Sequence, residues 1–265
     1  MNENRVVSLS EAASLVKSGQ SLALGGVTLY RRPVAFVYEL LRRQPRLSDL
    51  TLLCFTAGYE SDLLVGAGCV SRVRSCYFGL EIFGLAPMFT SARNIEVVQE
   101  TEGSLAAGLR ASMAGVGFMP ALAWIGTDML KLRPDVKCVT DPYTGEELVA
   151  FPALGCDVAV IHALVADRNG NARLNSNRGV DAELALVANT VIVTAEEIVD
   201  ELTSDVDIVG ALVTAVAHTP RGAWPTSCYP SYPVGGSELL RYVDECNAGG
   251  FEAFLSGVLA KVDRA

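Results

Sequence analysis

Apolar positions near the start of the chain change from helical spacing to short unbroken runs. Residues 9–16 carry apolar side chains at helical spacing, which predicts an amphipathic helix. The apolar run at 21–24 is too short for a helix and ends at Gly25 and Gly26, which predicts a strand followed by a tight turn. Helical spacing resumes from 33 to 43, with a proline at its first position. This stretch therefore predicts helix, strand, glycine turn and helix.

The same alternation continues through the first half of the chain. Strands are expected at 50–55, 70–78 and 95–99, and helices at 62–67 and 102–114. Strands that alternate with helices favour an α/β fold, in which a layered and mostly parallel sheet is flanked by helices. Ligands of such sheets usually bind at the edge formed by the carboxyl ends of the strands.

A polar turn at 141–145 interrupts the pattern in the second half. It lies between the short apolar segments 137–139 and 148–151, and so predicts a hairpin at the rim of the fold. The other elements expected here are strands at 158–163 and 190–195 and helices at 180–188, 239–246 and 251–262. No linker or repeat is evident, so residues 1–265 are expected to form one domain.

Composition and charge narrow the classes of function. Half of the residues are apolar, 19% are charged and only 7% are aromatic, as in a globular core built from Ala, Val and Leu. A formal net charge of -9 disfavours nucleic acid and anionic membranes as partners. No apolar run approaches the length of a membrane span, and residues 1–7 have no signal-peptide character. The chain is therefore expected to be cytoplasmic, with its seven scattered cysteines reduced.

The glycine pair is the first candidate for chemistry. Gly25 and Gly26 follow the first expected strand, where backbone N–H groups can approach a ligand and stabilise a developing oxyanion. The alternative is that they only make a tight connection between strand and helix. Both explanations stay open at this point.

Two arginines follow at the start of the next expected helix. Arg31 and Arg32 lie where a cation opposes the helix dipole, at a cost of about 0.3–1 kcal/mol. Capture of a phosphate or carboxylate would explain that placement. Solvation, or pairing with Glu60 or Asp62, would explain it equally well.

Three glutamates are further candidates. Glu100 and Glu102 lie just before and at the start of an expected helix, where the dipole stabilises a carboxylate. An ordinary acidic helix start is the simpler explanation for them.

Glu81 has apolar neighbours and is harder to explain as a surface residue. His162 and His218 show no metal-ligand spacing and are expected to be structural.

Several common motifs are absent from the sequence. There is no Gly-x-Gly-x-x-Gly, no Walker lysine and no Gly-x-Ser-x-Gly. Sites for a dinucleotide or a nucleoside triphosphate, and a serine-hydrolase site, are therefore poorly supported.

Eight segments together resemble the A-type subunit of glutaconate CoA-transferase. They occur in the same order along nearly the whole chain, which makes the resemblance more specific than any single motif. The segments are 8–12, 18–26, 32–36, 49–52, 64–68, 117–120, 156–163 and 227–229.

This resemblance implies a class I CoA-transferase fold and a similarly folded B-type partner, typically in an α2β2 heterotetramer. The substrates it implies are acyl-CoA thioesters and carboxylates, with no tightly bound cofactor and no metal. In that family a glutamate of the B-type subunit, commonly in a Ser-Glu-Asn-Gly motif, attacks the thioester and then carries CoA as a glutamyl thioester. The motif is absent from this sequence, so the nucleophile is expected in the partner.

A second branch, the steroid-ring-opening acyl-CoA hydrolases of cholesterol breakdown, is similar as well. There a glutamate of the A-type chain carries the reaction, and segment 102–111 matches it at Glu102. An arginine that this branch often has after Phe-x-Pro is replaced by Leu122, which favours the transferase. A non-catalytic small-molecule binding module is a third reading, because fold does not determine function. The expected catalytic residue is Glu102, and the expected substrate-binding residues are Gly25, Gly26, Arg31, Arg32 and Glu81.

Overall fold

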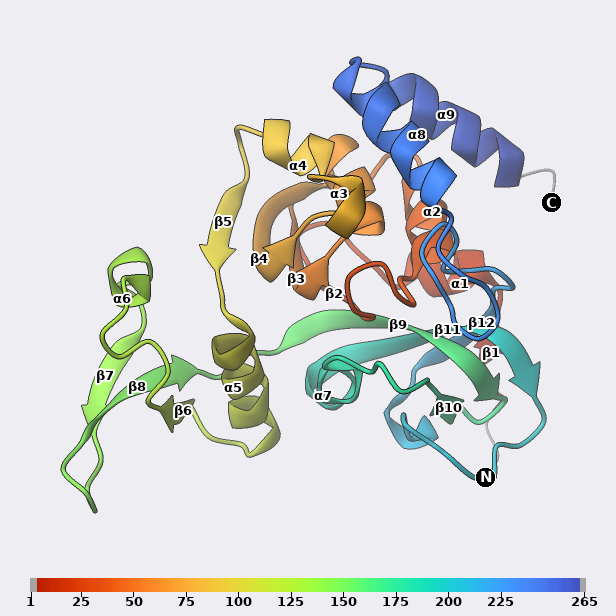
Figure 1. Cartoon of the computed structure of the whole chain (residues 1–265). Helices are drawn as coiled ribbons and strands as arrows, with labels where there is room; N and C mark the ends of the chain where they lie inside the picture. Colours follow the sequence, from red (N-terminus) through yellow and green to blue (C-terminus); the bar gives the residue numbers. More distant parts are fainter. Residues whose placement is uncertain (1–3, 263–265) are drawn as a thin grey trace.

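A large, mostly parallel sheet forms the centre of the computed structural model, which describes residues 4–262 (Figure 1). Within those residues this large sheet has nine strands. Their spatial order is β1 (Val6–Val7), β12 (Ala215–His218), β11 (Ala188–Val199), β9 (Cys156–Asp167), β2 (Ser21–Leu24), β3 (Leu50–Ala57), β4 (Val70–Phe78) and β5 (Glu96–Gln99), with β10 (Ala172–Arg173) antiparallel beside β9. The other neighbouring pairs run parallel, which confirms the expected α/β fold.

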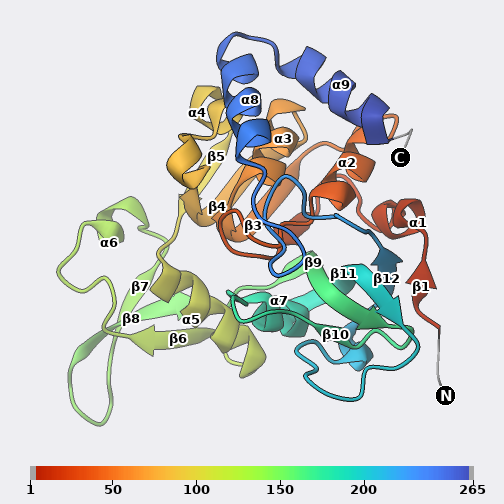
Figure 2. The same cartoon turned by 45° about the vertical axis from the view of Figure 1, so that its right-hand side comes forward.

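Helices cover both faces of this sheet. The α-helices are α1 (Leu9–Ser14), α2 (Val34–Arg42), α3 (Tyr59–Gly66), α4 (Pro87–Ser91), α5 (Glu102–Met113), α6 (Met129–Leu132), α7 (Asp181–Val187), α8 (Gly236–Asn247) and α9 (Phe251–Val262), and the 3₁₀ turns are η1 (Glu81–Phe83) and η2 (Gly210–Leu212). On one face, α5 and α7 bury Leu105, Leu109 and Leu184. On the other, α1, α2, α3, α8 and α9 enclose the largest apolar cluster (Figure 2). None of these described helices is long and apolar enough to cross a membrane.

A small antiparallel sheet projects beyond β5 (Figure 1). The expected hairpin is present as β7 (Lys137–Thr140) and β8 (Glu147–Pro152). A third strand, β6 (Phe118–Ala121), pairs with β8 and was not expected from the sequence. Its proline weakens the strand pattern, and proline is tolerated there because β6 is an edge strand. The Trp124 ring packs edge-on against the Phe151 ring of β8, with the two ring centroids 4.9 Å apart, and closes the base of this sheet.

Local signals explain most of the element boundaries. The side chain of Ser8 accepts from the backbone of Glu11, and Glu11 bonds back, which forms a capping box at the start of α1. Helix α3 begins at Tyr59, three residues before its expected start, because Gly58 turns the chain directly out of β3. Strand β12 was missed, since its short apolar run has no pattern of its own and is recognised only by pairing with β11.

Candidate active site at the carboxyl edge of the sheet

Four neighbouring strands, β2, β3, β4 and β5, end along one edge of the large sheet. The strand registers place Gly25 and Glu100 in the same row, three strand spacings or about 14 Å apart. The chain order reverses here, because β3 follows β2 on one side while β9 adjoins it on the other. Such a switch point is where open α/β sheets bind ligands. We call this edge, from Gly25 to Glu102, the carboxyl row.

Glycine turns bring the connections of the carboxyl row close together. Gly26 has a φ of 84°, and a Cβ there would lie 2.4 Å from the carbonyl oxygen of Tyr30. A Cβ on Gly58, which follows β3, would meet the carbonyl oxygens of Thr28 at 3.0 Å and Gly79 at 3.9 Å. The turns after β2, β3 and β4 therefore touch one another, and side chains would force them apart.

Replacing Gly26 with alanine is expected to destabilise the chain more than replacing Gly19, which serves as the matched control. Both have positive φ, but a Cβ on Gly19 meets nothing within 4 Å. Gly19→Ala should cost only the backbone strain, about 1–2 kcal/mol. Gly26→Ala should add about 1–3 kcal/mol for overpacking. Urea unfolding of the two variants measures the difference, and equal values would show that the turn yields without cost.

The backbone N–H groups of the glycine pair are already engaged. Gly25 donates to the carbonyl oxygen of Val160 at 2.9 Å, and Gly26 donates to Asp181 Oδ1 at 2.8 Å. Neither N–H group is therefore available to an oxyanion, and that expected role does not fit the structure. What the pair provides is the tight turn itself.

Arg31 is a fully buried anchor of that turn. Its guanidinium donates to the carbonyl oxygen of His162 at 2.7 Å, to that of Asn177 at 2.8 Å and to Asp181 Oδ2 at 2.8 Å. Asp181, the first residue of α7, thus holds both Arg31 and the N–H of Gly26. The sequence reasoning missed Asp181, whose only local signal is an acidic residue at a helix start.

Arg32 is buried in the same way on the other side of the turn. It donates to Glu60 Oε1 at 2.6 Å and to the carbonyl oxygen of Gly26 at 2.9 Å, and neither ionic side chain is exposed. Burial opposes the charged form of Arg32, yet the carboxylate of Glu60 holds its pKa above the usual value. Pairing with Glu60 is therefore confirmed. The capture of an external anion by either arginine does not fit, because both are enclosed and already paired.

Glu102 ends the carboxyl row as the first residue of α5 and is exposed. Thr101 caps the helix with Ser104, so Glu102 is not needed for capping. Within residues 4–262 its carboxylate makes no hydrogen bond or ion pair. Glu100, in contrast, is buried and bonded to Arg133 Nη1 at 2.8 Å. Of these two carboxylates, only Glu102 is free to meet a substrate.

Cys76, on β4, faces the start of α5. Burial, reinforced by the negative charges of Glu102 and Glu100, raises the pKa of this thiol to about 12. The thiol is therefore neutral near pH 7 and is not a competing nucleophile. Within the described residues, which include all seven cysteines, each cysteine is a free thiol, as the sequence predicted.

Glu81 lies in η1, beyond the turn after β4, and is exposed. Its backbone N–H donates to the hydroxyl of Tyr77 at 3.1 Å. Its apolar neighbours divide between the core and the surface: Leu80 is fully buried, whereas Ile82 is 92% and Leu85 is 70% exposed. Glu81 therefore belongs to an exposed apolar segment next to the carboxyl row rather than to a buried site.

A second polar cluster lies behind the turn. His162 is fully buried, with Nδ1 against Thr194 Oγ1 and Nε2 against Glu196 Oε1, each at 2.9 Å. Glu196 also accepts from the backbone N–H of Arg221 at 2.6 Å and from the hydroxyl of Tyr232. The structural role expected for His162 is confirmed. Glu196 was missed, because nothing in the local sequence marks an acidic residue of β11 as inward-facing.

This cluster also contains a buried thiol. Ligand-type atoms of His162, Glu196 and Cys228 lie within 4.8 Å of one another, a grouping that the sequence did not suggest. Burial, reinforced by Glu196, raises the pKa of the Cys228 thiol to about 12. The carboxylate and the imidazole already have hydrogen-bond partners, so the cluster connects β9, β11 and the loop at 219–232.

The chain matches a known protein family over most of its length. Residues 6–219 match the model described as Coenzyme A transferase. The chain is 34% identical over 237 residues to the A-type subunit of 3-oxoadipate CoA-transferase from Pseudomonas knackmussii, covering 86% of this chain and 83% of that one. It is 31% identical over 250 residues to the IpdA subunit of the cholesterol ring-cleaving hydrolase from Rhodococcus jostii, covering 85% and 81%.

Solved structures agree in fold over almost the full length. A variant of the decarboxylase AibA/AibB matches with a TM-score of 0.90 at 31% identity, covering 98% of this chain and 100% of that one. Glutaconate CoA-transferase of Acidaminococcus fermentans matches with a TM-score of 0.88 at 30% identity, covering 96% and 88%. Proteins with these names carry out transfer, ring cleavage or decarboxylation on one fold.

Proposed function

The chain belongs to the coenzyme A transferase family, and we propose that it is the A-type subunit of a heteromeric enzyme that moves CoA between carboxylic acids. The observation that carries this proposal is the near full-length likeness to the A-type subunit of 3-oxoadipate CoA-transferase. The B-type partner of the proposed complex is a chain of similar fold.

In the proposed reaction a glutamate of the partner attacks the acyl-CoA carbonyl and displaces the CoA thiolate, leaving an acyl anhydride. The thiolate then attacks the glutamyl carbonyl, which releases the first acid and leaves a glutamyl-CoA thioester. The second carboxylate reverses these steps and departs as the new acyl-CoA. Glu102 orients the reacting groups from the start of α5, and the turn held by Arg31 and Arg32 keeps the backbone close to the substrate.

Exposed apolar side chains support a partner surface beside the carboxyl row. Ile82 and Leu85 follow β4, while Phe118 and Leu122, exposed by 43% and 61%, follow α5. Apolar side chains clustered on exposed segments are typical of surfaces covered by another protein. We assign this surface to the B-type partner.

The first test is a comparison of the lone chain with the chain co-expressed with its B-type partner. We expect the lone chain to be inactive on acyl-CoA substrates, because the proposed nucleophile lies in the partner. Co-expression should give a defined complex by light scattering, with transfer activity. A lone monomer as active as the complex would contradict the proposal.

A ring-cleaving hydrolase is the second candidate, and one observation favours it. Glu102 matches the carboxylate expected in that branch, is exposed and has no described partner. In such an enzyme Glu102 would act as a general base toward water or the ring. The partner's sequence separates the two reactions, because a Ser-Glu-Asn-Gly nucleophile motif is expected only in the transferase.

A further inference from the structure

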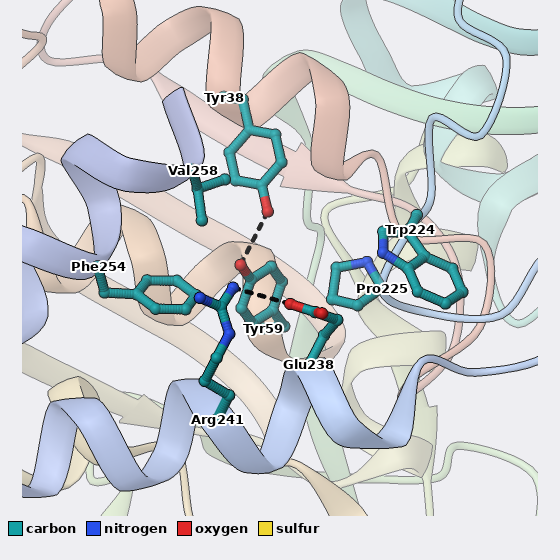
Figure 3. A pocket seen from close by; sticks show the side chains of 8 residues that line it. All are labelled: Tyr38, Tyr59, Trp224, Pro225, Glu238, Arg241, Phe254 and Val258. Carbon is teal, nitrogen blue, oxygen red and sulfur yellow. Dashed lines mark hydrogen bonds and ion pairs between the residues drawn. The ribbon is translucent and has the colours of Figure 1, made fainter. Parts of the chain in front are cut away.

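A cavity of about 230 Å³ opens between α2, α3, α8 and α9, and Figure 3 shows the side chains that line it. Aromatic rings dominate its walls. It is lined by Tyr38, Tyr59, Trp224, Pro225, Glu238, Arg241, Phe254 and Val258. For scale, an engineered apolar cavity of about 150 Å³ in another protein binds benzene. This cavity therefore has room for an aromatic ring with a polar substituent.

The two tyrosines leave one hydrogen-bond donor unused. The hydroxyls of Tyr38 and Tyr59 lie 2.8 Å apart and bond to each other, and both side chains are almost fully buried. One hydrogen bond uses one of their two protons. Within the part of the chain that the structure describes, no other group accepts the second proton.

Arg241 supplies a second unused donor. Its Nε is buried and has no partner within the described residues, although the outer part of the side chain reaches solvent. Figure 3 shows the guanidinium between Phe254 and Glu238, beside Tyr59. A buried donor without an acceptor is costly, and a ligand acceptor in the cavity would remove that cost.

The charges around Arg241 restrict what the acceptor can be. Its Nη2 donates to Glu238 at 2.8 Å, and its Nη1 lies 3.6 Å from Glu245 Oε1. Two carboxylates therefore already compensate this one cation. A ligand carboxylate or phosphate would be repelled, whereas a neutral carbonyl oxygen or ring nitrogen would not.

From these observations we infer that the cavity is a binding site for a small, neutral, planar aromatic molecule that carries a hydrogen-bond acceptor. The rings of Tyr59, Trp224 and Phe254 provide the apolar contacts. The tyrosine hydroxyl and the Arg241 Nε–H fix the orientation of the acceptor.

The site is distinct from the carboxyl row and does not rest on the proposed function. It lies among α2, α3, α8, α9 and the loop at 224–225, in the helical layer opposite α5. Tyr59 nevertheless directly follows Gly58, whose backbone touches the turns of the carboxyl row. A molecule in the cavity would thus contact the residue behind those turns without occupying them.

Three probes of one shape test the inference by calorimetric titration of the full chain. Benzamide combines the ring with a neutral acceptor, benzoate makes the acceptor anionic, and toluene removes it. We expect benzamide to bind about tenfold or more tightly than either of the others. Equal affinity for benzamide and toluene would show that the unused donors play no part. Tighter binding of benzoate would overturn the charge argument.

Matched variants assign the binding to this cavity. Arg241→Lys keeps a cation beside Glu238 and Glu245 but removes the Nε donor, so benzamide affinity should fall by about tenfold. Val258→Phe should fill the cavity and abolish binding, while Ser256→Phe, exposed on the same helix, should leave it unchanged. Thermal unfolding confirms that each variant is folded. Benzamide binding that survives Val258→Phe in a folded chain would refute the site.

Discussion

Replacing Asp181 with alanine is expected to lower the free energy of unfolding by about 3–5 kcal/mol, because it leaves the buried charge of Arg31 uncompensated. The N–H of Gly26 loses its acceptor in the same step. Urea unfolding followed by circular dichroism measures the loss. Turnover of the complex should fall as well, since Asp181 holds the turn that ends β2.

Two controls isolate the buried pair. Asp128→Ala removes an exposed partner of Lys131 and should leave stability unchanged within error. The double variant of Arg31→Met and Asp181→Ala should be less destabilised than the sum of its single changes, because no unpaired charge remains. A loss for Asp181→Ala no larger than that for Asp128→Ala would mean that the pair does not hold the turn.

Glu102→Gln is expected to separate the two candidate reactions when it is measured in the complex. The amide keeps the size of the side chain but cannot act as a base. In a ring-cleaving hydrolase turnover should fall about a hundredfold or more. In the proposed transferase the loss should be below about tenfold, because the nucleophile lies in the partner.

Trapping experiments complete this test. Hydroxylamine or borohydride should still capture a glutamyl-CoA adduct on the partner chain when Glu102→Gln is present in a transferase. Glu11→Gln provides a matched control. Glu11 also lies in the first turn of a helix, but that helix is α1, which is not part of the carboxyl row. Full activity of Glu102→Gln with an unaltered pH profile would remove Glu102 from the mechanism.

Local pattern was sufficient to predict most of the fold. The order of strands and helices from α1 to β5, apart from the short helix α4 and the 3₁₀ turn η1, follows from apolar periodicity. The match over residues 6–219 confirms the family resemblance that the segments of the chain suggested. The sequence reasoning failed where an element depends on pairing alone, as β6 and β12 do.

The candidate site also has some features that the local sequence predicts and others that depend on distant residues. The sequence by itself determined the turn at Gly25 and Gly26 and the helix start at Glu102, because positive φ and the capping pattern at Thr101 are local requirements. Only the tertiary structure decided that Arg31 is buried and paired, because its partner Asp181 lies 150 residues further along the chain. Nothing near an arginine in the sequence tells whether a distant carboxylate will neutralise it. Arg31 and Arg32, whose adjacent positive charges suggested an anion site, are therefore internal supports of the turn. The exposed carboxylate of Glu102 remains the candidate reactive group, a prediction that the variants above test.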